Sequence, residues 1–415
     1  MKFGLIGEKL SHSYSKRIFE DILGYPSYDL VEVKREELPG FVSKTDLDAF
    51  NVTVPYKTEV IPLLQGVDEK AARIGAVNAV RREQDGFYGT NTDYDGLRIL
   101  LLHSGIPIRG KTVLILGTGG TSKTAAAVCA DLGAKKIVKV SRKKSETAVS
   151  YQEAPGVGGE VIINTTPVGM YPNTQESPVD LAAFSGLCGV VDVVYHPLCT
   201  ALVAQAKELG IPAVSGLLML AAQAAAAEAF FSGKNLPEGQ LQKRALKIEK
   251  ELRGEIENLI LVGMPSVGKT TVGELLAKAL RRPFYDTDAE LEKKIGQIPD
   301  FIRTNGEEAF RNAESALIAD LTGSARGAVI ATGGGAVLRG ENRRALSENG
   351  RVILLVRAAD AVAFDQSRPL SDTKEKWAAL WKVREPIYRA FADVTISGFA
   401  SPDDACNRIL EELKK

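Results

Sequence analysis

The sequence predicts an α/β fold along its whole length, and two glycine-rich loops support that prediction. Residues 263–270 (Gly-Met-Pro-Ser-Val-Gly-Lys-Thr) fit the phosphate-loop pattern G-x-x-x-x-G-K-[ST] at every fixed position. Residues 117–122 (Gly-Thr-Gly-Gly-Thr-Ser) are a variant of the dinucleotide-binding fingerprint. Each loop lies between an apolar run typical of a strand and a run with helical spacing. At 415 residues the chain is long enough for two or three such domains.

The composition is that of a soluble globular protein. Lys plus Arg (52) balance Asp plus Glu (52), which argues against nucleic acid and anionic membranes as partners and favours small molecules. The only long apolar run, residues 217–231, is Ala-rich and carries Gln223 and Glu228, so we expect a buried helix rather than a membrane span. Four cysteines without a C-x-x-C pattern and three histidines without metal spacing predict a reduced, cytoplasmic protein with no structural metal.

We expect residues 1–103 to form a substrate domain with strands at residues 3–6, 29–33, 49–54 and 87–90. Residues 11–15 (Ser-His-Ser-Tyr-Ser) place hydroxyls on a turn where they can bind a carboxylate, although such turns are also common helix caps. Residues 51–57 (Asn-Val-Thr-Val-Pro-Tyr-Lys) place Asn51, Thr53 and Lys57 where α/β sheets expose ligand-binding groups.

Asp93, in the polar turn at residues 89–96, has two interpretations. It can cap the helix that begins near Tyr94. Alternatively, paired with Lys57, it can hold a hydroxyl and help to move a proton to or from a carbonyl.

Residues 104–215 predict a Rossmann-like cofactor domain with strands at 111–116, 136–140, 160–164 and 189–194. After the second strand, Arg142 and Lys143 offer cations to a 2′-phosphate where an acidic residue would favour NAD, so NADP is preferred; a solvated turn is the alternative. The loops that follow residues 164 and 194 should line the nicotinamide side. We expect the Ala-rich helix to return to the first domain, so that residues 216–242 complete it.

Residues 243–256 mix both charges densely and predict a solvated helical linker. Residues 257–415 then form the phosphate-loop domain, with a strand at 259–262 leading into the loop. Lys269 would bridge the terminal phosphates and Thr270 would ligate Mg²⁺. A glycine-rich turn that binds no ligand is the alternative.

Further polar groups follow in this last domain. A predicted strand at residues 284–288 ends in two carboxylates, Asp286 and Asp288, suited to Mg²⁺ and a substrate hydroxyl. Arg311 and Glu314 lie one helical turn apart, which is also the spacing of an ordinary ion pair. The strand at 329–331 opens onto the glycine-rich residues 332–336, where the backbone can approach a ligand closely.

Residues 1 to about 245 resemble shikimate dehydrogenase. The resemblance rests on residues 11–15, 51–57, 75–78 (Gly-Ala-Val-Asn), 91–93 (Asn-Thr-Asp), 117–120, 164–170 (Asn-Thr-Thr-Pro-Val-Gly-Met) and 216–223. It implies that Lys57 and Asp93 are the catalytic pair. It implies substrate contacts from Ser13, Ser15, Asn51, Thr53, Asn78, Tyr195 and Gln223, and NADP contacts from Gly117, Thr118, Gly119, Gly120, Thr121, Ser141, Arg142, Lys143, Thr165, Gly216 and Met219. Ser141 stands where the family commonly has Asn.

Residues 257–415 resemble shikimate kinase through the phosphate loop, residues 286–288 (Asp-Thr-Asp), Phe310-Arg311, the glycines 333–335, residues 368–370 (Arg-Pro-Leu) and Arg384. The resemblance implies catalytic roles for Lys269, Asp288 and Arg368, and shikimate contacts from Asp288, Arg311, Gly334 and Arg384. It implies ATP contacts from Gly263, Ser266, Val267, Gly268, Lys269, Thr270 and Thr271, and Mg²⁺ contacts from Thr270 and Asp286. The family's lid before Arg368 is usually longer and more basic than residues 364–367.

Together the resemblances imply a bifunctional enzyme. NADPH would reduce 3-dehydroshikimate to shikimate, and Mg²⁺-ATP would convert shikimate to shikimate 3-phosphate. One alternative is an NAD-dependent quinate/shikimate dehydrogenase fused to the kinase. Another is a non-catalytic regulator that senses shikimate or quinate, which the presence of Lys57, Asp93, Lys269, Asp288 and Arg311 opposes. The motifs say nothing about the oligomeric state.

Overall fold

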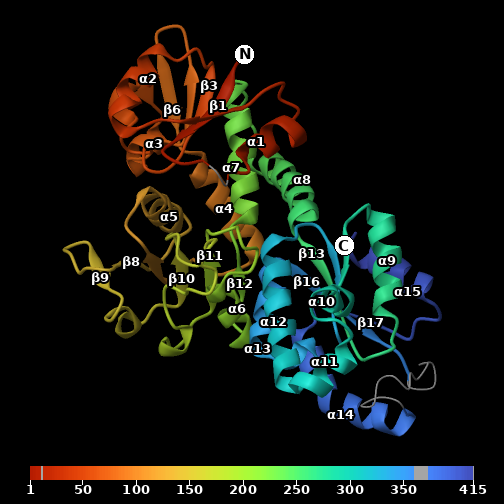
Figure 1. The fold of residues 1–415 in the computed structure, drawn as a ribbon. Helices are drawn as coiled ribbons and strands as arrows, with labels where there is room; N and C mark the ends of the chain where they lie inside the picture. The colour runs from red at the N-terminus through yellow and green to blue at the C-terminus, as the bar shows by residue number, and fades with distance from the viewer. Residues whose placement is uncertain (11–12, 359–372, 415) are drawn as a thin grey trace. The chain divides into compact units, whose positions relative to one another are not determined.

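A computed structural model describes residues 1–10, 13–358 and 373–414. The chain divides into two compact units, Met1–Arg253 and Gly254–Lys415. Each unit has its own sheets and its own buried apolar clusters, coloured from red to green and from green to blue in Figure 1. None of the helices in the described ranges combines the length and apolarity needed to cross a membrane.

The first unit begins with a mixed six-stranded sheet of order β2-β1-β3-β5-β6-β4. The parallel strands β2, β1 and β3 are followed by antiparallel pairing of β3 with β5 and of β5 with β6. The strands are β1 (Phe3–Gly7), β2 (Asp29–Glu32), β3 (Ala49–Val52), β4 (Gly66–Val67), β5 (Ala79–Arg82) and β6 (Phe87–Thr90). The helices are α1 (Ser15–Arg17), η1 (Ile18–Ile22), η2 (Arg35–Glu37), α2 (Leu38–Lys44), η3 (Ile61–Leu63), α3 (Glu69–Ile74) and α4 (Thr92–Ser104).

The second sheet of this unit is entirely parallel, with the order β12-β11-β10-β7-β8-β9. Its strand order reverses between β7 and β10, and dinucleotides bind at such a switch point in doubly wound sheets. The strands are β7 (Thr112–Leu116), β8 (Lys136–Ser141), β9 (Ala148–Ser150), β10 (Val161–Asn164), β11 (Gly189–Asp192) and β12 (Ala213–Val214). The helices are α5 (Gly120–Asp131), η4 (Ala154–Val157), η5 (Leu181–Ala183) and α6 (Ala201–Glu208).

Helix α7 (Leu217–Phe231) is the predicted Ala-rich helix, and it runs alongside α4 (Figure 1). The two helices approach closely because Gly96 has no side chain: a Cβ there would lie 2.7 Å from the carbonyl oxygen of Met219. At its other end, the ring of Phe231 stacks on that of Phe3 in β1. Helix α7 therefore packs with the first sheet, while the boundary residues of the domains stay a prediction.

Helix α8 (Glu238–Ile256) corrects the prediction of a purely solvated linker. Ala245, Ile248, Leu252 and Ile256 are all buried, and they recur at spacings of three and four residues that form one helical stripe. In addition, Arg244 in α8 forms an ion pair of 3.0 Å with the buried Glu228 of α7. The charged residues of this segment therefore leave one apolar face, and most of α8 belongs to the first unit.

The second unit has a parallel five-stranded sheet of order β14-β15-β13-β16-β17. The strands are β13 (Asn258–Val262), β14 (Phe284–Asp286), β15 (Val329–Ala331), β16 (Gly350–Val356) and β17 (Val394–Ser397). The helices are α9 (Lys269–Leu280), α10 (Thr287–Ile295), α11 (Ile298–Asn305), α12 (Glu307–Ser324), η6 (Ala336–Leu338), α13 (Gly340–Glu348), α14 (Lys374–Phe391) and α15 (Pro402–Glu412). The central strand β13 is buried along its whole length, and its carboxyl end opens onto the phosphate loop.

Candidate active sites

Lys57 and Asp93 form a short ion pair in the first unit. Lys57 lies in the turn after β3 and Asp93 in the first turn of α4, and Lys57 Nζ donates to Asp93 Oδ2 at 2.6 Å. The side chains are only 16% and 9% exposed. Asn91, rather than Asp93, caps α4 by accepting a hydrogen bond from the Tyr94 N–H at 3.0 Å. The capping interpretation of Asp93 is therefore wrong, and its carboxylate is available to Lys57.

Asn78 holds the second oxygen of this carboxylate. Its Nδ2 donates to Asp93 Oδ1 at 2.8 Å, and its Oδ1 accepts from the backbone N–H of Thr92 at 2.6 Å. Asn51 supports Asn78 in turn, because Asn51 Nδ2 donates to the Asn78 carbonyl at 3.1 Å. The hydroxyl of the buried Tyr28 donates to Asn51 Oδ1 at 2.7 Å. Asn51 thus has a supporting contact that the sequence did not indicate.

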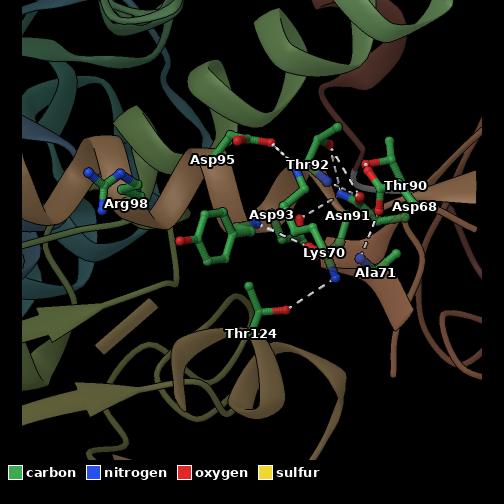
Figure 2. Close-up of polar contacts among 12 residues, drawn as sticks. Asp68, Lys70, Ala71, Thr90, Asn91, Thr92, Asp93, Asp95, Arg98 and Thr124 are labelled. Atoms are coloured by element: carbon green, nitrogen blue, oxygen red, sulfur yellow. Dashed lines mark hydrogen bonds and ion pairs between the residues drawn. The ribbon is translucent and has the colours of Figure 1, made fainter. Parts of the chain in front are cut away.

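Figure 2 shows the polar contacts that fix the start of α4 around Asp93. Asp68 caps α3 through the Ala71 N–H at 2.7 Å and accepts from the Thr90 hydroxyl at 2.6 Å. Nearby, Lys70 forms a 2.6 Å ion pair with Asp95, and burial raises the pKa of Asp95. These contacts join α3, β6 and α4, so they fix the position of the backbone that carries Asp93.

The remaining predicted substrate ligands of this unit lie on separate elements. Ser13 Oγ accepts from the Ser15 N–H at 3.2 Å in the turn before α1, whereas residues 11 and 12 lie outside the described residues. Thr53 follows β3, and Gln223 lies in α7 with its Nε2 donating to the Leu220 carbonyl at 3.0 Å. The Tyr195 ring packs edge-on against Tyr14 at 6.0 Å, and its burial raises the pKa of Tyr195 to about 12. The Tyr195 hydroxyl is therefore a neutral hydrogen-bonding group.

The dinucleotide-type loop joins β7 to α5 and approaches the ion pair. A Cβ on Gly120 would lie 3.7 Å from Lys57 Cβ, so the helix N-terminus that suits a pyrophosphate stands next to Lys57. Thr165, after β10, donates its hydroxyl to the Leu116 carbonyl at 2.6 Å and so closes the other side of this loop. Arg142 and Lys143 follow β8, the neighbour of β7, and both are exposed. Two exposed cations therefore follow the strand that pairs with β7, and their contact with a 2′-phosphate stays a prediction.

Gly216 and Asp192 fix the chain where β11 ends and α7 begins. A Cβ on Gly216 would lie 2.0 Å from the Val193 carbonyl oxygen, so a side chain at this position would push α7 away from the end of β11. Asp192, fully buried, accepts from Asn164 Nδ2 at 2.9 Å, the Val194 N–H at 3.0 Å and the Thr200 hydroxyl at 2.7 Å. Burial raises the pKa of Asp192 to about 6. The sequence did not indicate Asp192, although it ends the strand that precedes Tyr195.

In the second unit, the phosphate loop joins β13 to α9. Gly268 has φ 97°, a left-handed conformation that favours glycine. Lys269 Nζ lies over the loop and donates to the carbonyls of Gly263 and Met264 at 2.9 Å each. The side chain of Val267, a residue of this loop, packs in the apolar core. Only its backbone is therefore available to a ligand. A basic group over a glycine-rich turn at the N-terminus of a helix fits the phosphates of a nucleotide.

Thr270 and Asp286 are adjacent, as a shared Mg²⁺ site requires. The Thr270 hydroxyl donates to Asp286 Oδ2 at 2.6 Å, while Asp286 Oδ1 caps α10 through the N–H of Asp288 at 3.0 Å. The strand ends at Asp286, and Asp288 lies in the first turn of α10 rather than in the predicted strand. Within the described ranges, no group of three or more His, Cys, Asp or Glu side chains forms a metal cluster. A hydroxyl and one carboxylate suit a Mg²⁺ ion that also binds phosphate oxygens.

The glycine-rich loop after β15 collects the predicted acceptor-site residues. A Cβ on Gly333 would lie 2.4 Å from Asp288 Oδ1, and one on Gly335 would lie 2.3 Å from Arg311 Nη1. Between them, the Gly334 carbonyl accepts from Arg384 Nη1 at 3.1 Å. One carboxylate and two guanidinium groups from α10, α12 and α14 thus surround three consecutive glycines. This arrangement suits a hydroxylated, anionic acceptor.

Arg311 forms an ion pair of 2.8 Å with the buried Glu314, so the ordinary i,i+3 pair exists within this cluster. Burial raises the pKa of Glu314, and its Oε1 would lie 3.0 Å from a Cβ on Gly333. The helical spacing from Arg311 was the signal for Glu314. Arg368 and the predicted lid at residues 364–367 lie outside the described residues.

Known protein families match each unit separately. The family model of the shikimate dehydrogenase substrate binding domain matches residues 5–80, and the shikimate kinase model matches residues 265–414. Shikimate dehydrogenase (NADP(+)) of Clostridium beijerinckii is 37% identical over 242 residues, which cover 54% of this chain and 90% of that protein. Shikimate kinase of Pseudomonas savastanoi pv. phaseolicola is 47% identical over 149 residues, which cover 34% of this chain and 86% of that protein.

Solved structures agree for the first unit. The chorismate mutase/shikimate 5-dehydrogenase fusion protein from Clostridium acetobutylicum aligns with a TM-score of 0.56 and 35% identity, over 61% of this chain and 98% of that chain. Shikimate 5-dehydrogenase of Thermus thermophilus, in complex with NADP(H) and shikimate, aligns with a TM-score of 0.53 and 28% identity, over 60% of this chain and 99% of that chain. The chain therefore belongs to the shikimate dehydrogenase family in its first unit and to the shikimate kinase family in its second, and it is a fusion of the two enzymes.

Proposed function

We propose that the chain catalyses two consecutive reactions, reduction of 3-dehydroshikimate to shikimate and phosphorylation of shikimate to shikimate 3-phosphate. The observation that carries the proposal for the first reaction is the 2.6 Å pair of Lys57 and Asp93 beside the cofactor loop at Gly120. Support for the second comes from Asp288, Arg311 and Arg384 gathered around one loop. When bound, NADPH supplies the hydride, and Mg²⁺-ATP supplies the phosphoryl group with part of its charge neutralised.

In the dehydrogenase unit, Lys57 delivers the proton that the carbonyl oxygen needs as it becomes a hydroxyl. Asp93, held by Asn78, keeps the Lys57 ammonium in place and accepts a hydrogen bond from the substrate. Ser13, Ser15, Thr53, Tyr195 and Gln223 supply neutral hydrogen bonds to the substrate. Ser141, Arg142 and Lys143 would hold the 2′-phosphate of NADP, and residues 117–121, Thr165, Gly216 and Met219 would hold the rest of the cofactor.

In the kinase unit, Asp288 orients the hydroxyl that attacks, and Arg311 and Arg384 hold the acceptor carboxylate. Guanidinium groups suit this task because their planar fork matches a carboxylate. Lys269 and the backbone of residues 263–271 would bind the phosphates, while Thr270 and Asp286 would hold Mg²⁺. Positioning and charge stabilisation supply most of the catalysis in such a reaction.

The direct test is a single mixture of 3-dehydroshikimate, NADPH and Mg²⁺-ATP, with shikimate 3-phosphate measured at the end. We expect shikimate 3-phosphate to form, and shikimate to accumulate when ATP is omitted. Parallel assays with NAD and quinate test the alternative dehydrogenase: clear preference for NAD would overturn the role of Arg142. Absence of both turnovers, with ligand binding retained, would identify a sensing protein instead.

A further inference from the structure

Helix α14 contacts both halves of the kinase site. At its start, the indole Nε1 of Trp377, a residue only 3% exposed, donates to the carbonyl of Pro265 in the phosphate loop at 3.1 Å. Further along, Arg384 Nη1 and the Tyr388 hydroxyl both donate to the carbonyl of Gly334 in the acceptor loop. Residues 377, 384 and 388 are spaced by seven and four, which places them on one face of the helix.

The two loops also touch each other. A Cβ on Gly334 would lie 2.8 Å from Pro265 Cδ, so the acceptor loop packs directly on the phosphate loop. Pro265, Gly334 and α14 therefore form a closed set of contacts. A shift of the Pro265 carbonyl would break the contact of α14 with the phosphate loop. Arg384 contacts the acceptor loop instead.

The bond to Pro265 fixes the direction of a backbone N–H. In a trans peptide the carbonyl and the following N–H point in opposite directions, so holding the Pro265 oxygen orients the N–H of Ser266. Ser266 has φ 64°, a left-handed conformation that non-glycine residues rarely adopt. A neighbouring bond that holds this peptide plane therefore stabilises the loop conformation that the structure has.

We propose that Trp377 is a positioning residue of the nucleotide site, whose indole N–H holds the Pro265–Ser266 peptide in the orientation that binds phosphate. The inference rests on the proposed kinase function of this unit. Its chemical basis is one neutral hydrogen bond, whose loss changes an equilibrium by about 2- to 10-fold.

The alternative is that Trp377 only fills the core. Its ring stacks on Trp381 at 6.1 Å between ring centroids, and Trp381 stacks on Tyr388 at 6.1 Å. Trp381 is therefore a matched control, because it lies in the same helix and the same ring stack. These are the only two tryptophans in the chain.

The test compares Trp377→Phe with Trp381→Phe in the full chain. We expect Trp377→Phe to weaken MgADP binding, measured by titration calorimetry, by about 2- to 10-fold and to raise the KM for ATP similarly. Amide hydrogen exchange at residues 266–268 should become faster. Shikimate binding without nucleotide should stay within about twofold of the unmodified protein. Trp381→Phe should leave MgADP binding and loop exchange unchanged, even where it lowers the thermal stability.

Equal effects of the two substitutions on MgADP binding would overturn the proposal, as would unchanged loop exchange in Trp377→Phe. If Trp377→Phe does not fold, β-(3-benzothienyl)alanine can replace the single tryptophan left in Trp381→Phe. This analogue keeps the ring shape but lacks the N–H, and its MgADP binding decides between the same two outcomes. Turnover by the unmodified protein tests the kinase function itself, so failure of that function is distinguishable from failure of the role of Trp377.

Discussion

Replacing Lys57 by Met tests the proposed dehydrogenase chemistry most directly. Methionine keeps most of the apolar volume of the side chain but removes the ammonium group that donates to Asp93. Loss of a positioned proton donor lowers a rate by about 10²- to 10⁴-fold, and we expect NADPH oxidation to fall within this range. Phosphorylation of added shikimate should not change, because its proposed residues all lie in the other compact unit.

The same substitution should also lower the free energy of unfolding. Removing one partner of a buried ion pair costs about 3–5 kcal/mol. The Lys57 and Asp93 side chains are 16% and 9% exposed, and Asn78 still donates to Asp93, so we expect the lower end, about 3 kcal/mol. Adding Asp93→Asn removes the unpaired charge. The double variant should therefore regain most of the stability without regaining activity.

Three measurements test the role of Lys57 and the independence of the two sites: NADPH oxidation by absorbance, shikimate 3-phosphate formation by chromatography, and urea unfolding. A fall in dehydrogenase rate of less than about tenfold would refute the role of Lys57 as the proton donor. Loss of phosphorylation together with reduction, in a variant that remains folded, would refute two independent sites.

The remaining predictions concern other residues of the two sites. Lys269→Met should abolish phosphorylation while leaving NADPH oxidation unchanged in the same preparation. Arg142→Glu should raise the KM for NADP by about 10- to 100-fold and leave that for NAD nearly unchanged, since charge-assisted bonds to a 2′-phosphate are lost. Gly333→Ala adds a Cβ 2.4 Å from Asp288 Oδ1 and should lower phosphorylation by about 100-fold; full activity would show that Asp288 needs no fixed position. Because burial raises the pKa of Asp192 to about 6, its ionisation lowers the free energy of unfolding as the pH rises from about 4 to 6. The total loss is about 3 kcal/mol. Asp192→Asn should accordingly stabilise the protein at pH 7 but not at pH 4 in urea unfolding, because an asparagine keeps the bonds from Asn164 and Val194 and can donate to Thr200.

The sequence predicted best what local patterns determine. The two glycine-rich loops, the strands before them and the Ala-rich helix depend on residues close together in the chain, and the structure has each of them. The role of Asp93 as a partner of Lys57 rather than a cap was open, because both interpretations use the same residue type in the same turn. Only the position of Asn91, two residues earlier and in cap geometry, decides between them.

Contacts between distant segments were not predictable in this way. Trp377 lies 112 positions from its acceptor Pro265, and no spacing rule connects the two. Likewise, Asp192 contacts Asn164 because β10 and β11 pair in the sheet. The linker at residues 243–256 is helical as predicted but not fully solvated, since counting charges over α8 overlooked its buried stripe at Ala245, Ile248 and Leu252.

On the proposed assignment, the two sites hold the same acid in chemically different ways. In the first unit the candidate ligands of the substrate carboxylate are the neutral hydroxyls of Ser13 and Ser15, whereas in the second they are Arg311 and Arg384. Hydrogen bonds to a carboxylate are charge-assisted at both sites, but only an arginine adds a full opposite charge and a planar fork that matches the carboxylate. The difference favours release of shikimate from the site that makes it and capture by the site that consumes it. Phosphoryl transfer from ATP supplies the free energy for net flux, and this difference in affinity lets shikimate move between the sites through solution.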